Sequence, residues 1–202
     1  MKKVEGQEST VTFHTTGVSK LGGPLIVNLV IRKVFEQVRT NNLILRMPIP
    51  EDSPFVLSIE GDPATNRYRP SGPMKNLNEA EEKVEEWRKD WLTYGYGYWV
   101  AVWPPQSDVI GVGGIRRYHW RERDVLNLYY RFSPKAWGHG YATELARVAV
   151  QMARDHIPEL PVVARIRSSN TPSIRVAEKI GLQHRPDLDT TEHMVFIKGW
   201  TN

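Results

Sequence analysis

The sequence predicts a single α/β domain built around a mixed β-sheet, and three observations support this. A chain of 202 residues with 40% hydrophobic content suits one domain with an ordinary core. Apolar and aromatic runs typical of strands alternate with segments whose apolar residues recur every three or four positions, as in helices. The resulting order, β-α-α-β-β-β-α-β-α-β, fits a mixed sheet with few crossovers.

The N-terminal half of this order contains one strand and two helices. Residues 43–46 read as the strand, and residues 50–61 as a short helix. A loop at 62–74, rich in Pro, Arg, Asn and Gly, leads to Asn76, a good helix cap, and Gly95 ends the helix that follows. The apolar residues of this second helix form one stripe, which we expect to be buried: Ala80, Val84, Trp87 and Trp91.

The C-terminal half alternates strands with helices. A polar turn at 121–124 joins two of its strands. A last helix is expected with Thr171 as its cap, Pro172 at its first position and Gly181 at its end. The helix before it, 140–156, is expected to bury Leu145, Val148, Ala149 and Met152. The strands are predicted at 98–103, 109–118, 125–132, 162–167 and 194–197.

Residues 1–39 are expected to be an extension that precedes a domain spanning 40–202. Residues 9–15 are rich in threonine and alternate loosely, so they favour a strand, although a mobile tail is the alternative for the first twenty residues. After the Gly-Gly-Pro break at 22–24, four apolar residues follow at helical spacing. They are open to two interpretations, a cap on the domain or a contact with a second subunit in a homodimer: Ile31, Val34, Phe35 and Val38.

Composition excludes several classes of protein. The chain has no cysteine, which rules out disulfides and thiolate zinc sites and fits a cytoplasmic location. The scattered histidines predict no metal site. No targeting segment is evident, and the longest apolar run, 25–31, is too short to span a membrane.

The net charge of +4, with 23 acidic residues interspersed, indicates a solvated mixed surface. Attraction to an anionic ligand or to RNA is the alternative. The chain has no dense Lys/Arg run, so nucleic acid is an unfavoured partner.

The most informative segment is 129–144, where an apolar strand runs through a glycine turn into an amphipathic helix. Gly138 and Gly140 carry no Cβ, so a phosphate can approach the main chain closely. The first amides of the helix lack partners, and the helix dipole favours negative charge there. The arrangement therefore predicts a diphosphate site. The alternative is a turn that only packs a helix on a sheet, because G-x-G-x-x-G and P-loop patterns are both absent.

A second segment, Asn-Thr-Pro-Ser-Ile-Arg-Val-Ala-Glu-Lys-Ile-Gly-Leu at 170–182, adds to this. Together with Lys-Ala-Trp-Gly-His-Gly-Tyr-Ala at 135–142, it resembles the GCN5-related N-acetyltransferase (GNAT) superfamily, closest to the branch of ribosomal-protein alanine acetyltransferases. The first segment matches the family's [Q/R]-x-x-G-x-[G/A] motif, and the second its N-x-x-S-x-x-x-x-E-K-x-G-[F/L] pattern. Residues 40–46 resemble its opening strand, so the resemblance covers about 40–200 and implies a mostly antiparallel sheet flanked by helices.

The resemblance implies that acetyl-CoA binds along the strand that ends at Phe132, with its pyrophosphate on the amides of 137–142. Lys135 stands where the family has Gln or Arg, and is otherwise a solvated surface lysine. The family's asparagine contacts the pantetheine arm. The residues that this assigns to acetyl-CoA are Tyr130, Phe132, Lys135, Trp137, Gly138, His139, Gly140, Tyr141, Ala142, Asn170 and Ser173.

Ser173 and Asn170 are the catalytic residues that the resemblance implies. Ser173 matches a serine proposed to donate a proton to the leaving sulfur, whereas its ordinary role would be to bond backbone in the first helical turn. Asn170 can equally cap the helix. Tyr130 is a rival proton donor, with packing in the sheet as its alternative.

The general base is unassigned, because Asn127 falls where many relatives carry glutamate, and an amide cannot accept the proton. A water chain, Glu122, Asp124 or His119 can serve instead, and an amine that arrives neutral needs no strong base.

The implied reaction moves an acetyl group from acetyl-CoA directly to a primary amine, either a protein N-terminus or a small molecule. The alternatives are a non-catalytic module that binds acyl-CoA or docks a partner, which Asn127 favours, and a protein that associates with RNA or the ribosome. An acceptor pocket in this fold lies between the early helices and the central strands. Its expected lining is Arg67, Tyr68, Trp99, Tyr118 and Trp120, although core packing is the favoured role for Trp99.

Overall fold

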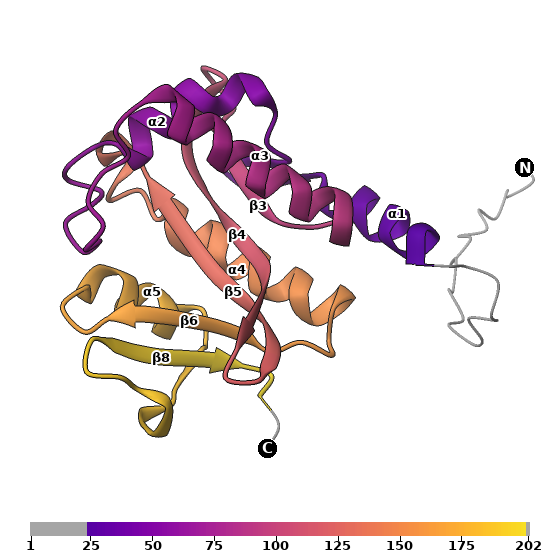
Figure 1. The fold of residues 1–202 in the computed structure, drawn as a ribbon, viewed down its shortest axis with the longest axis vertical. Coiled ribbons are helices and arrows are strands. Elements are labelled where there is room, and N and C mark those ends of the chain that lie inside the picture. The colour runs from indigo at the N-terminus through magenta and orange to yellow at the C-terminus, as the bar shows by residue number, and fades with distance from the viewer. Residues whose placement is uncertain (1–23, 201–202) are drawn as a thin grey trace, which may run out of the picture.

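The computed structural model describes residues 24–200, and the strand predicted at 9–15 lies outside them. Within this range one sheet is flanked by five α-helices (Figure 1). The helices are α1 (Pro24–Phe35), α2 (Ser53–Glu60), α3 (Leu77–Tyr94), α4 (Tyr141–His156) and α5 (Thr171–Lys179). The strands are β1 (Gln37–Arg39), β2 (Ile44–Arg46), β3 (Tyr98–Trp103), β4 (Asp108–Trp120), β5 (Arg123–Phe132), β6 (Val162–Arg167), β7 (Gln183–His184) and β8 (His193–Lys198).

The sheet has the strand order β1-β2-β3-β4-β5-β6-β8-β7. Every neighbouring pair is antiparallel except β5 and β6, which are parallel. The sequence-based prediction of a single α/β domain with a mostly antiparallel mixed sheet is therefore confirmed. None of the helices in residues 24–200 combines the length and the apolar character that a membrane span requires.

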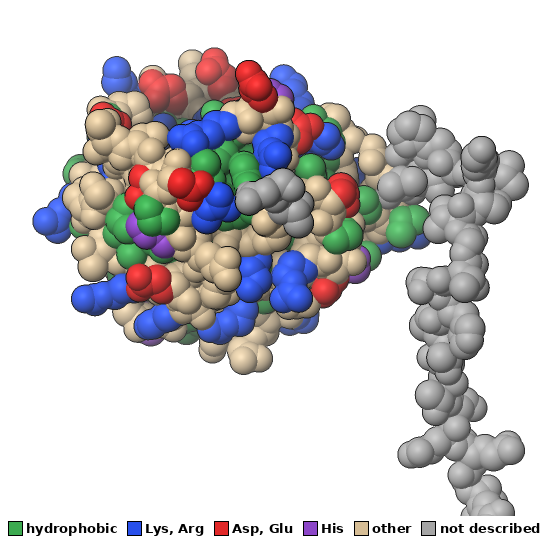
Figure 2. All heavy atoms as spheres, turned by 90° about the horizontal axis from the view of Figure 1, so that it is seen from below, with side chains coloured by type: hydrophobic (Ala, Val, Ile, Leu, Met, Phe, Trp, Pro, Cys, Tyr) green, Lys and Arg blue, Asp and Glu red, His purple; other side chains and the backbone are tan. Residues whose placement is uncertain are grey.

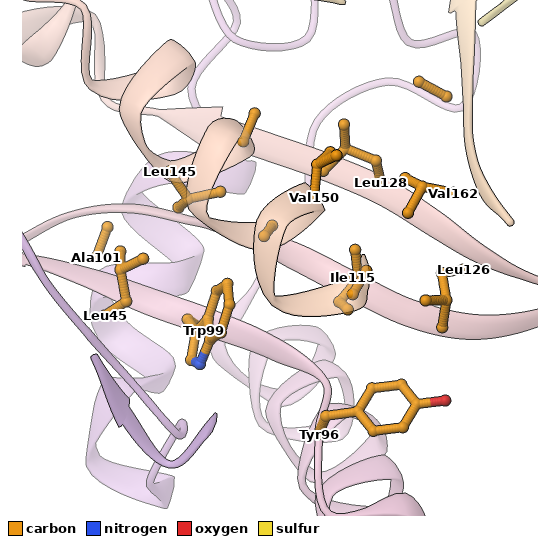
Figure 3. Close-up of a cluster of buried hydrophobic side chains, with 14 of the residues drawn as sticks. Leu45, Tyr96, Trp99, Ala101, Ile115, Leu126, Leu128, Leu145, Val150 and Val162 are labelled. Carbon is orange, nitrogen blue, oxygen red and sulfur yellow. The ribbon is translucent and has the colours of Figure 1, made fainter. Parts of the chain in front are cut away.

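The helices cover the two faces of the sheet, which we call the α2/α3 face and the α4/α5 face. On the α2/α3 face, Val84 and Trp87 of α3 pack against Tyr98 and Val112. On the α4/α5 face, the core includes the residues labelled in Figure 3, among them Leu145 and Val150 of α4 with Leu126 and Leu128 of β5. Basic and acidic side chains are mixed on the side of the molecule seen in Figure 2.

The long helices follow the predicted apolar stripes because burial of one face is what stabilises them. All four residues predicted for the α3 stripe are buried. Asn76 caps α3 by accepting a hydrogen bond from the Glu79 amide at 3.0 Å, and Gly95 ends the helix with a φ of 80°. In α4 the stripe is shifted: Leu145 and Ala149 are buried, whereas Val148 and Met152 are only half-buried. The remaining buried residues of α4 are Ala146, Val150 and Ala153.

Further details of the prediction were wrong. Thr171 does not cap α5, because the Asn170 side chain accepts from the Ser173 amide and makes Asn170 the cap. The polar turn is shorter than the predicted 121–124. It consists of Arg121 and Glu122, both with positive φ, and β5 already begins at Arg123.

Val38 does not continue the apolar stripe of α1, which ends at Phe35, but lies on β1. Phe35 is fully buried and stacks on Trp99, with ring centroids 6.0 Å apart. The short edge strands β1 and β7 were not predicted.

Candidate acetyl-CoA and acceptor site

The divergence of β5 and β6 is the central feature of the site, and the gap that it leaves between the two backbones is called the opening below. The two strands pair only at Leu126 with Val162 and at Asn127 with Val163, and beyond these pairs they diverge (Figure 1). On its other side β5 stays paired with β4 as far as Phe132. The edge of β5 that faces β6 therefore presents main-chain groups beyond Asn127 to the opening, where an extended ligand can bond them like an added strand.

The opening leads to the glycine turn at the start of α4. Gly138 and Gly140 have φ of 83° and 80°, a region that side chains with a Cβ avoid. A Cβ built on either would meet nothing within 4 Å, so the main chain of the turn borders open space. Gly140 is the N-cap of α4, and the amides at this end have no partner within the helix. This geometry suits an anion.

Side chains of the turn fix its shape. The Trp137 indole donates to the Phe132 carbonyl at 2.8 Å while half of the Trp137 surface stays exposed. His139 Nδ1 lies 2.9 Å from the Trp137 carbonyl, and its ring stacks on Tyr141 at 5.4 Å. Lys135 is exposed on a short 3-10 helix before the turn. These contacts support the observed shape of the predicted phosphate-binding segment.

The structure brings Asn170, Ser173 and Tyr130 together. The Asn170 side chain accepts from the Ser173 amide at 3.3 Å, and the Tyr130 hydroxyl donates to the Ser173 carbonyl at 3.2 Å. The start of α5 is thus bonded to β5 across the diverging strands. Burial raises the pKa of Tyr130 to about 12, so its phenol keeps its proton at neutral pH.

Asn127 lies on the opposite side of β5, on the α2/α3 face. Its amide donates to the Tyr98 hydroxyl at 2.7 Å. Burial raises the pKa of Tyr98 to about 12, although the hydrogen bond with Asn127 opposes the shift. Asn127 and Tyr98 are therefore both neutral and hydrogen-bonded to each other. Neither side chain accepts a proton from an amine at neutral pH.

The other base candidates lie at the closed end of the β4–β5 hairpin. Asp124 accepts from Arg117 at 2.5 Å and pairs with His119 at 3.0 Å, and these hydrogen bonds hold the pKa of Asp124 below its usual value. Glu122 is exposed in the turn itself. Phe132 marks the other end of β5, so these groups are separated from the glycine turn by the length of the strand.

A buried carboxylate on the α2/α3 face was missed by the sequence analysis. Glu60, at the end of α2, is 3% exposed. It accepts hydrogen bonds from Arg131 at 2.9 Å, from Arg69 at 3.0 Å and from the Tyr129 hydroxyl. Asn66 joins the network by accepting from Arg131 at 2.9 Å. The network attaches the loop after α2 to β5, and its only local signal was an arginine within the aromatic run 129–132 of that strand.

His193 on β8 is a second residue that the sequence analysis missed. It is opposite Arg167 in the register of β6 and β8. Burial, followed by the charges of Arg167 and Arg165, lowers the pKa of His193 from 6.5, so the imidazole is neutral at neutral pH.

No group of three His, Cys, Asp or Glu side chains that could hold a metal ion occurs in the described range.

The predicted acceptor residues fall into separate places. Trp99 is fully buried, and its indole donates to the Phe35 carbonyl at 2.7 Å, so it belongs to the core rather than to a pocket wall (Figure 3). Arg67 and Tyr68 form a cation–π pair at 5.6 Å on the loop after α2. This loop is the one that Glu60 attaches to β5.

Tyr118 and Trp120 lie near the hairpin end of β4. Tyr118 is 41% exposed and is covered in part by the Arg165 guanidinium, 4.9 Å from its ring centroid. Trp120 packs against Trp200 at 6.1 Å, and Arg121 lies over its ring at 5.0 Å. Of the predicted lining, Tyr118 is thus the residue in contact with a charged side chain of β6.

Comparison with known proteins agrees with this geometry. Residues 42–183 match the family model described as the acetyltransferase (GNAT) domain. The YkkB protein of Bacillus subtilis (strain 168) is 30% identical over 55% of this chain, and the match spans 64% of YkkB, less than two thirds of its length.

Solved structures share the fold. One is the ribosomal-protein-S5-alanine acetyltransferase of Vibrio fischeri, with 13% identity, a TM-score of 0.60 and coverage of 80% of this chain and 95% of that one. Another is the spermidine N-acetyltransferase of Vibrio cholerae in complex with CoA and spermine, with 17% identity, a TM-score of 0.61 and coverage of 78% and 94%. As the motifs at 135–142 and 170–182 predicted, the chain belongs to the GNAT acetyltransferase family of acyltransferases.

Proposed function

We propose that this protein transfers an acetyl group from acetyl-CoA to a primary amine, with both substrates bound at once. The observation that supports this most is the divergence of β5 and β6 past Asn127, which opens toward the glycine turn at the start of α4. A free strand edge and a set of unpartnered helix amides suit the two ends of one ligand, an amide-containing arm and a diphosphate.

In this proposal the pantetheine arm pairs with the main chain near Tyr130 and Phe132, and Asn170 and Ser173 lie beside it. The diphosphate binds the amides of 137–142, and Lys135 adds a positive charge. The relative positions of these groups on β5, the turn and the start of α5 are consistent with this assignment.

The transfer forms a bond between the amine nitrogen and the acetyl carbon and breaks the bond to sulfur. The amine must lose a proton, and the sulfur leaves as a thiol. Ser173 matches the position of the family's proposed proton donor. The Tyr130 phenol instead donates to the Ser173 carbonyl and holds the serine in place. Since Asn127 bonds Tyr98 and is no base, the amine enters neutral or gives its proton to water.

A non-catalytic acyl-CoA-binding module is the second candidate, and the Asn127–Tyr98 pair is the observation that favours it. Calorimetry with acetyl-CoA, followed by a thiol-release assay on a panel of amines and peptide N-termini, separates the two. We expect binding with thiol release for one class of amine. Binding without release from any amine would favour the module, and absence of binding would contradict both.

A matched pair of glycine variants tests where acetyl-CoA binds. Gly140→Ala and Gly72→Ala both place a Cβ at a left-handed residue, with φ of 80° and 72°, and neither Cβ meets an atom within 4 Å. The two variants therefore carry a similar conformational cost of about 1 kcal/mol. We expect Gly140→Ala to weaken acetyl-CoA binding about tenfold and Gly72→Ala to leave it unchanged. Equal effects would contradict a diphosphate at the turn.

A further inference from the structure

The α2/α3 face of the sheet carries an arginine at the point where β5 and β6 part. Asn127 and Val163 form the last pair of these strands. Side chains alternate between faces along a strand, so Arg165 lies on the same face as Val163, one step further along. Val163 is buried in a cluster with Val195, which is opposite Arg165 in the register of β6 and β8. The backbone of Arg165 is therefore fixed beside the opening.

Arg165 differs from the arginines around it. On the same face, Arg116 pairs with Glu86 and Asp90, Arg131 with Glu60, and Arg167 with Glu192. Arg165 is exposed, and within residues 24–200 no carboxylate lies within ion-pair distance of it. Its contact is with the Tyr118 ring, 4.9 Å from the guanidinium carbon.

The Tyr118 contact orients the guanidinium without using its hydrogen bonds. The ring attracts the charge without accepting an N–H hydrogen bond in its plane, and the Arg165 guanidinium has no hydrogen-bond acceptor among residues 24–200. That edge is a rigid fork that matches both oxygens of a carboxylate. After burial, the charges of Arg167 and Arg165 also lower the pKa of His193, and the charge of Glu192 opposes them. An arginine that no carboxylate pairs with attracts an anion and repels a cationic group of an acceptor.

We propose that Arg165, held by Tyr118, binds an acidic group of the acetyl acceptor, so that the acceptor is an amine that carries a carboxylate and not a polyamine. The inference rests on the proposed acetyl transfer and deepens it by naming the class of acceptor. A free amino acid and a peptide with an acidic residue near its N-terminus offer the same carboxylate. The two sources are therefore compared within one experiment.

The experiment uses acceptors that differ only in the carboxylate. Lysine is compared with cadaverine, its decarboxylated form, and a short peptide with glutamate at its second position is compared with the glutamine peptide. Thiol release gives kcat/KM for each, and calorimetry on the CoA complex gives binding even where turnover is absent. We expect the wild-type protein to prefer the acidic member of at least one pair by about tenfold or more, and the pair that shows it identifies the source.

Arg165→Gln is expected to abolish that preference, and Arg165→Lys to restore part of it by keeping the charge without the fork. The matched control is Arg154→Gln, which removes an exposed arginine at the far end of α4 from Gly140 and should keep the preference. Binding of acetyl-CoA is measured for every variant and should not change. A preference that survives in Arg165→Gln, or equal use of cadaverine and lysine by the wild-type protein, would overturn the inference. Absence of acetyl-CoA binding in the wild-type protein would instead count against the proposed function. Calorimetry of the same acceptor pairs on the free protein would then still test whether Arg165 selects the carboxylate.

Discussion

The two sides of β5 are built on different principles. Leu128, Tyr130 and Phe132 face α4 and α5, where the contacts are apolar apart from the bond of Tyr130 to the start of α5. Tyr129 and Arg131, which alternate with them, face α2 and bond the buried Glu60. On β5, the side chains beside the glycine turn are therefore mainly packed in the apolar core, and those beside the loop after α2 make polar contacts.

The two sides of β5 differ in how closely they depend on the sequence of this chain. The turn and helix start on one side use backbone amides, and any sequence that forms the turn supplies them. The other side uses charged side chains whose partners come from distant parts of the sequence, as in the bond between Arg131 and Glu60. Acceptor selectivity is therefore expected to reside on the α2/α3 face and acetyl-CoA binding at the turn.

Removal of the buried Glu60 carboxylate should disturb the α2/α3 side of β5 and leave the α4/α5 side intact. Glu60→Ala leaves Arg131 and Arg69 without their shared partner in a buried site, and we expect the free energy of unfolding to fall by about 3–5 kcal/mol. Denaturant titration measures the loss. The control Glu85→Ala removes an exposed partner of Arg88 at 3.6 Å and should cost under about 0.5 kcal/mol.

Acetyl-CoA binding by the Glu60→Ala protein, measured under conditions where it is folded, should stay within about twofold of the wild-type value, since a truncation on one face of β5 leaves the turn unchanged. A large loss of acetyl-CoA affinity in the folded variant would show that the two sides of β5 are coupled.

Local signals explain which parts were predictable from the sequence. The α3 stripe, the glycine turn and most strands are encoded by neighbouring residues. Asn76 and Gly95 delimit α3. Gly138 and Gly140 adopt a left-handed φ that glycine allows without any long-range contact. The role of Asn170 as a helix cap was equally local, although Thr171 was taken for the cap.

Long-range pairing explains the rest. Glu60 and Arg131 are 71 residues apart, and nothing near either one marks the other as its partner. Arg165 becomes informative only when the register of β5, β6 and β8 shows which charges surround it. Trp99 was named with the pocket although core packing was favoured for it, because an aromatic residue in a strand suits either a wall or a core. Its full burial and its bond to Phe35 decide for the core.

A pair of substitutions on the α4/α5 face sharpens the assignment of the proton donor. Ser173→Ala should lower kcat about tenfold, or about 1.4 kcal/mol in barrier height, with little change in stability. Tyr130→Phe removes the bond to the Ser173 carbonyl and should cost about 1 kcal/mol of unfolding free energy with a smaller effect on kcat. Steady-state kinetics and denaturant titration of both proteins measure the two effects. A larger fall in kcat for Tyr130→Phe would make the phenol the donor.

The smallest effect expected is a pH dependence of stability from His193. Its pKa in the folded protein lies below the usual 6.5, so the unfolded chain binds a proton more readily than the folded one. This contribution to stability is complete above the unfolded value and is lost as the pH falls through 6.5 toward the folded value. Unfolding free energies measured between pH 7.5 and about 5 should therefore decline less in His193→Gln than in the wild-type protein. Arg165→Gln should also reduce the decline, but only in part, because burial and Arg167 still lower the pKa of His193. An unchanged decline in His193→Gln would mean that the pKa of His193 is not lowered in the folded protein.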